Sequence, residues 1–127
     1  MRRMALGAFV LVGALLSWRA TRAPEDPSAT VARFFAAVER HDCEEAKKLV
    51  AGDLGRSLAR PEGCQAFLDE YASHQMKFGG TLDARVDGRD PDARLVQARL
   101  GLNARERTHV LRVERARDAG GWRLTRF

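Results

Sequence analysis

The sequence predicts an α+β domain in which three amino-terminal helices pack on a four-stranded antiparallel sheet, with a hydrophobic leader helix before them. Two observations support this class. Apolar residues recur with a helical period between residues 29 and 75, and they alternate with polar residues from residue 82 onward. Short turn-rich segments separate the alternating runs, so the strands should pair antiparallel and turn one face toward the helices.

The leader, residues 1–23, has the form of an export signal. A basic Met-Arg-Arg start is followed by 15 residues without charge, fewer than the roughly 20 that cross a bilayer. The cleavage site is poor, because a cut after Ala20 would leave bulky Trp18 three residues before it. We therefore predict an extracytoplasmic domain that is periplasmic, secreted after cleavage, or anchored in the inner membrane by an uncleaved signal.

The net charge of +5 comes mostly from this leader. The leader holds four arginines and no acidic residue, so residues 24–127 carry 18 basic and 17 acidic side chains. This near balance argues against a nucleic-acid partner. Residues 94–127 alone hold nine basic and three acidic side chains. They form either a basic face for an anionic partner or membrane surface, or the solvated outer face of strands.

A linker, residues 24–28, leads into the domain at residues 29–127. Its residues Asp26, Pro27 and Ser28 are suited to the cap and first turn of a helix. Apolar residues at helical spacing follow, namely Val31, Phe34, Phe35 and Val38. The phenylalanines of this face belong either to the core or to the wall of a ligand pocket.

The first cysteine, Cys43, lies in one of the most charged segments of the chain, where no core is expected. Asp42 before it and Glu45 after it resemble a capping box for a second helix that ends near Gly52. This pattern places Cys43 in the first turn, on the inner side of the helix.

The second cysteine, Cys64, begins a third helical stripe behind Pro61, which continues through Phe67, Leu68, Tyr71 and Gln75. No third thiol competes in this chain, so an exported domain with two inward cysteines should form a Cys43–Cys64 disulfide. A nucleophilic Cys43 assisted by His41, or a zinc site that also uses His74 and His109, lacks the necessary spacing. We expect no metal and no cofactor.

Four alternating runs predict the strands. Their apolar members are Leu82, Ala84 and Val86; then Val96, Ala98, Leu100 and Leu102; then His109, Leu111 and Val113; and finally the segment 122–127. Turn-rich segments at residues 87–92, 103–106 and 118–121 separate them.

This order of elements resembles the nuclear transport factor 2-like superfamily, the cystatin-like cone fold, and in particular its small bacterial exported members. The resemblance covers residues 27–127 and depends on four segments, residues 29–38, 42–49, 64–67 and 121–125. It implies that the helices pack into the concave face of a curved sheet.

The resemblance supports the fold more than any function; our preferred hypothesis is a noncatalytic domain of the bacterial cell envelope that binds a small apolar ligand or a partner protein. The interior of the cone is the expected pocket. Its candidate lining residues are Phe34, Phe35, Phe67, Tyr71 and Trp122.

Two other functions remain open. The superfamily also contains isomerase-like and cyclase-like enzymes, and here Tyr71 and His109 would be the catalytic pair, since Asp83 and Glu114 are expected on the outer face. Alternatively, the domain is a structural module that forms a homodimer through the outer face of its sheet. A cavity where Tyr71 and His109 converge would favour the enzyme, and an exposed apolar patch would favour the dimer.

Overall fold

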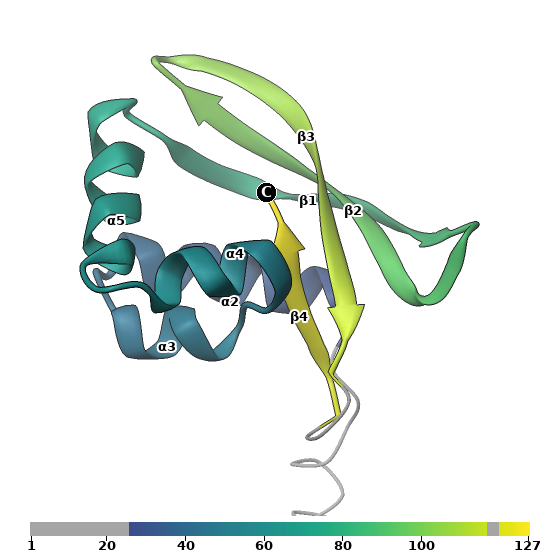
Figure 1. Ribbon diagram of the computed structural model, residues 1–127. Helices are drawn as coiled ribbons and strands as arrows, with labels where there is room; N and C mark the ends of the chain where they lie inside the picture. Colours follow the sequence, from purple (N-terminus) through teal and green to yellow (C-terminus); the bar gives the residue numbers. More distant parts are fainter. Residues whose placement is uncertain (1–25, 117–119) are drawn as a thin grey trace, which may run out of the picture.

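The computed structural model describes residues 26–116 and 120–127, which form four helices and one four-stranded antiparallel sheet (Figure 1). This confirms the α+β class, while the leader lies outside the described residues. The helices are α2 (Pro27–Glu39), α3 (Cys43–Lys48), α4 (Gly52–Ala59) and α5 (Gly63–Ser73). The strands, in spatial as in sequence order, are β1 (Lys77–Asp87), β2 (Asp90–Leu102), β3 (Arg105–Arg115) and β4 (Trp122–Arg126). None of the described helices has the length and apolar content needed to cross a membrane.

Helix α2 begins as its sequence predicts. The side chain of Asp26 accepts a hydrogen bond from the backbone N–H of Ser28 at 3.0 Å, and Pro27 occupies the first turn. The helix thus includes the last two residues of the segment assigned to the linker. Phe34 and Phe35 are fully buried on its inner face.

The prediction of three helices is wrong by one, because α4 was missed. Gly52 was expected to end a helix, but it begins one instead, with a left-handed φ of 60°. A Cβ at this position would lie only 3.3 Å from the Cβ of Thr125 in β4. Glycine therefore allows both the reversal of the chain and the close approach of α4 to the sheet, where Leu58 is fully buried.

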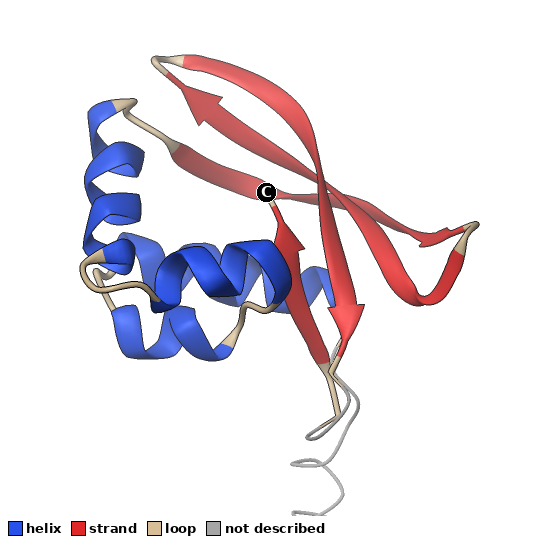
Figure 2. Cartoon of the chain, viewed as in Figure 1, coloured by secondary structure: helices blue, strands red, loops and turns tan. Residues whose placement is uncertain are grey.

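Strand β1 is longer than predicted and differs in its exposure. It starts at Lys77, five residues before the predicted run begins at Leu82, and includes Gly79 and Gly80, with register shifts before and after Thr81. Leu82 and Val86, expected on a buried face, are 46% and 62% exposed. The reason is that the β1–β2 hairpin projects beyond the helices, which gather at the other end of the sheet (Figure 2).

Alternation in β2 and β3 is confirmed. Val96 lies opposite Leu111, and both are fully buried, whereas the neighbouring Val110 is exposed. The inner face of these two strands consists largely of small and branched apolar side chains that pack against the helices. Its fully buried members are Val96, Ala98, Leu100, Leu111 and Val113.

The predicted disulfide is present and joins α3 to α5. The Cα atoms of Cys43 and Cys64 are 6.0 Å apart, across 21 residues of sequence. Asp42 caps α3 by accepting a hydrogen bond from the N–H of Glu45 at 3.1 Å, which places Cys43 in the first turn as expected. In the chain-entropy model, closing a loop of this length stabilises the fold by about 3 kcal/mol.

The two edges of the sheet differ. A segment between α3 and α4 covers the edge of β4: the N–H of Leu124 donates to the carbonyl of Leu49 at 2.8 Å, and the N–H of Ala51 donates to the carbonyl of Leu124 at 3.0 Å. Strand β1 has β2 on one side and no described strand on the other. Within the described residues, the β4 edge is therefore paired around Leu124, whereas the β1 edge is open.

Candidate functional site

An aromatic cluster fills the space between α2, α5 and the start of β1. Phe35 stacks on Phe78 with ring centroids 4.8 Å apart, and its ring lies 5.6 Å from that of Phe127. Phe67 meets Phe127 edge to face at 5.7 Å. Phe34 and Tyr71 complete the cluster through contacts with the rings of Phe35 and Phe67.

A pocket of about 180 Å³ opens on the outer side of this cluster. Its walls are mainly apolar, with Glu70 and His74 at the exposed rim; they are formed by Phe67, Glu70, Tyr71, His74, Met76 and Phe127. A second hollow of about 300 Å³ is also lined by Tyr71 and Met76. These two side chains therefore border both hollows.

The hydroxyl of Tyr71 is held by Glu39, the last residue of α2. It donates a hydrogen bond to Oε1 of Glu39 at 3.2 Å, and the backbone N–H of Phe78 donates to the same oxygen at 3.3 Å. Burial, the negative charge of Glu39 and the hydrogen bond to it raise the pKa of the Tyr71 phenol far above its usual value. Tyr71 therefore stays protonated at neutral pH and ties α5 to α2.

The five residues predicted to line one pocket are distributed over three environments. Phe34 and Phe35 are fully buried core residues, and Phe67 and Tyr71 line the aromatic pocket. Trp122 lies elsewhere, with the guanidinium groups of Arg94 and Arg115 at 5.0 and 4.9 Å from its ring.

Tyr71 and His109, the pair predicted as catalytic, do not line the same hollow. His109 lies on β3 opposite Ala98, on the same face as the buried Leu111, as alternation predicted. It does not line the aromatic pocket or the hollow beside it.

Sequence reasoning missed several residues of the pocket and its surroundings. Phe78 was overlooked because the glycines after it concealed the start of β1, although its register opposite Leu100 places it on the inner face. Glu39 and Met76 lie just outside the helical stripes that define the core, so periodicity gives no signal for them. Phe127 was taken only as the end of the last strand.

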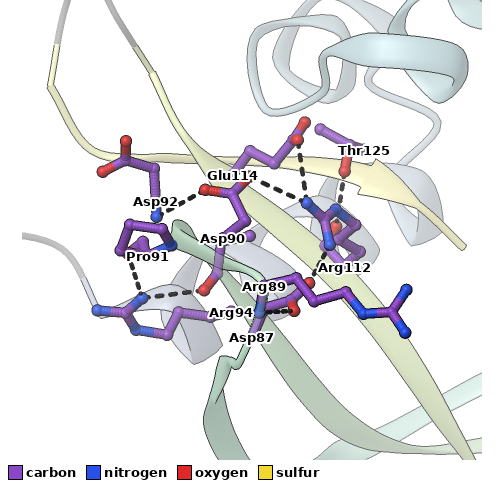
Figure 3. A network of polar contacts seen from close by, with 10 residues as sticks. Asp87, Arg89, Asp90, Pro91, Asp92, Arg94, Arg112, Glu114 and Thr125 are labelled. Carbon is purple, nitrogen blue, oxygen red and sulfur yellow. Dashed lines mark hydrogen bonds and ion pairs between the residues drawn. The ribbon is translucent and has the colours of Figure 1, made fainter.

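A polar network holds the other end of the sheet (Figure 3). The Arg112 guanidinium on β3 binds the carboxylate of Asp87 and lies 3.2 Å from that of Asp90 and 3.5 Å from that of Glu114. The hydroxyl of Thr125 donates to the backbone carbonyl of Arg112 at 3.2 Å. One arginine thus joins the start and end of the β1–β2 turn to β3.

The electrostatics of this network favour ionised Asp87. The backbone N–H of Arg89 donates to this carboxylate at 3.0 Å, and together with the hydrogen bond from Arg112 it lowers the pKa of Asp87. A polar hollow of about 410 Å³ lies beside the network and is lined by Asp90, Asp92, Glu114, Arg115 and Ala116. Within residues 26–116 and 120–127, no group of His, Cys, Asp and Glu side chains is arranged to hold a metal ion.

Neither a scan against protein-family models nor a search of curated proteins finds a match for this chain. The structure has two candidate functional features, the aromatic pocket and the Arg112 network. The network connects strands through paired charges, whereas the pocket presents unfilled apolar walls. Concave apolar walls with a few polar groups at the rim are typical of small-molecule sites.

Proposed function

We propose that this chain is a noncatalytic domain of the bacterial cell envelope that binds a small apolar ligand. The observation that carries the proposal is the open pocket walled by Phe67, Tyr71, Met76 and Phe127. Small-ligand pockets commonly measure roughly 300–1,000 Å³. The hollow of about 180 Å³ therefore suits a ligand near the size of one or two aromatic rings.

The pocket lies beside the interior that the resemblance to the nuclear transport factor 2-like cone predicted as the ligand space, because the buried Phe34 and Phe35 occupy that interior. Placement outside the cytoplasm is supported by the leader and by the Cys43–Cys64 disulfide, which is compatible with an oxidising compartment. We propose that the leader either directs secretion or holds the domain at the inner membrane.

The state of Tyr71 supports binding over catalysis. Its hydroxyl already donates to Glu39, and its pKa lies far above neutrality, so it is poorly suited to exchange protons with a substrate. In a binding site, the same hydrogen bond holds the ring as a rigid wall.

The test is thermal unfolding of the full-length chain by circular dichroism, in a mild non-ionic detergent, with increasing concentrations of indole or 1-hexanol. A ligand that binds only the folded state raises Tm in a saturable way. The Phe67→Ala variant should lose this rise, because it removes one aromatic wall. Ala66→Ser, at the exposed neighbouring position of α5, should retain it. The proposal is contradicted if neither indole nor 1-hexanol raises Tm in a saturable way. It is also contradicted if the ligand raises the Tm of both variants equally.

A further inference from the structure

The open edge of the sheet has a symmetric pattern of side chains. Residues 82–86 of β1 read Leu-Asp-Ala-Arg-Val. Alanine is at the centre, opposite charges flank it, and an apolar residue lies at each end. If two copies of this segment run antiparallel about Ala84, Leu82 lies opposite Val86 and Asp83 lies opposite Arg85. Both pairings are favourable across antiparallel strands.

The register within the sheet is compatible with such a pairing. Residues 83–86 of β1 pair in regular succession with β2, and Val86 lies opposite Arg94. The register shift before Asp83 places Thr81 and Leu82 together near Ala98, on the same face as Ala84 and Val86. The apolar members of the pattern therefore share one face and the two charges share the other.

The exposure of these residues indicates that the edge has no partner among residues 26–116 and 120–127. Leu82, Ala84, Arg85 and Val86 are all exposed. Asp83 has one carboxylate oxygen, Oδ1, that is inaccessible to solvent and has no hydrogen-bond partner in the described part of the chain; its Oδ2 lies 3.2 Å from Nε of Arg85. An unpaired buried oxygen of this kind is uncommon in folded proteins.

We propose that a second copy of this chain pairs with β1 through residues 82–86, antiparallel and with the two-fold axis at Ala84. The Arg85 side chain of the second copy then lies opposite Asp83, where opposite charges attract, and one sheet continues through both copies. Such a two-fold contact uses the same surface on each copy. Because each copy uses its β1 edge once, the assembly closes at two chains. This interface differs from the outer sheet face considered from the sequence, and it does not depend on the proposed ligand.

The first test is a charge exchange followed by sedimentation equilibrium of the full-length chain, in a density-matched detergent. In the proposed dimer, residue 83 of each copy lies opposite residue 85 of the other, so either single variant, Asp83→Arg or Arg85→Asp, creates two pairs of like charges. Each variant should weaken dimerisation about tenfold or more. The double variant Asp83→Arg with Arg85→Asp restores both pairs and should recover a dimer close to that of the wild type. If the chains associate through the leader instead, the wild type, both single variants and the double variant should dimerise equally. Equal dimerisation of all four proteins, or a monomeric wild type, contradicts the proposal.

The second test uses the residue at the two-fold axis. In the proposed register the Cα atoms of Ala84 in the two copies lie opposite each other, at the roughly 4.5–5.5 Å typical of antiparallel pairs and within reach of a disulfide. The Ala84→Cys variant should form a crosslinked dimer under mild oxidation. Ala36→Cys, also at an exposed alanine but on α2, is the matched control and should stay uncrosslinked. Equal crosslinking of both variants, or of neither, contradicts the proposal.

Discussion

Helices cover the sheet where β1 begins, whereas the β1–β2 hairpin at the other end projects past them (Figure 1). The covered end is held by stacked aromatic rings and by the disulfide between α3 and α5. The projecting end is held by one arginine among three carboxylates. Apolar burial and partly exposed ion pairs differ several-fold in their contribution to stability. The covered end should therefore determine global stability, and the projecting end should respond to pH and salt.

The largest effect is expected from Phe35→Ala at the covered end. Phe35 is fully buried and contacts the rings of Phe34, Tyr71, Phe78 and Phe127, so its removal leaves a cavity that these groups cannot all fill. The free energy of unfolding, measured by urea titration, should fall by about 3–5 kcal/mol. Phe127→Ala is the control within the same cluster; because Phe127 is 42% exposed, its loss should cost clearly less. Equal losses would contradict the prediction that burial of Phe35 determines the size of the effect.

Removal of the disulfide should rank second. The double variant Cys43→Ala with Cys64→Ala opens a loop across 21 residues, and stability should fall by about 3 kcal/mol if the chain-entropy model holds. Comparison of urea titrations for the variant and the oxidised wild type measures this loss. A reduced wild type should behave like the variant, and a variant as stable as the oxidised protein would contradict the prediction.

At the projecting end, Arg112→Met should have an intermediate effect. The substitution keeps part of the apolar stem but leaves the carboxylates of Asp87, Asp90 and Glu114 without their shared cation. The Arg112 side chain is 24% exposed, so solvent screens part of the effect, and a loss of about 1–2 kcal/mol is expected. Arg99→Met is the matched control, since its pair with Glu106 at 3.9 Å is more exposed and should contribute little. High salt should narrow the difference between the wild type and Arg112→Met.

The sequence predicted the elements whose local pattern agrees with their tertiary environment. The stripe from Val31 to Val38 and the cap at Asp42 are local signals, and the Cys43–Cys64 pair followed from the presence of two cysteines in the sequence; the structure confirms all three. Helix α4 was missed because its large apolar residues are limited to Leu54 and Leu58, and because Gly52 resembles the end of a helix; its position depends on contact with β4.

The candidate sites were harder to predict than the fold, because they combine distant segments. The pocket needs Phe67 from α5 and Phe127 from the end of the chain, and no periodicity links these two residues. The apolar pattern of Leu82 and Val86 predicted a strand correctly, but whether a strand face is buried depends on how far the helices extend over it. Alternation of apolar and polar residues identifies the apolar face of a strand, but it does not show which other element covers that face.

The smallest effect, and the most specific to the projecting end, is the pH dependence at Asp87. Hydrogen bonds from Arg89 and Arg112 lower the pKa of this carboxyl group in the folded state, so folding favours its ionised form. This stabilisation is complete above the unfolded pKa of about 3.9 and is lost as the pH falls through the lower folded value. The Tm difference between the wild type and Asp87→Asn should therefore be largest near neutral pH and narrow below about pH 4. Asp92→Asn, in the same hairpin but with a side chain 72% exposed, should change Tm less at every pH. A constant difference between wild type and Asp87→Asn from pH 7 to 3 would assign the effect of Asp87 to packing instead of charge.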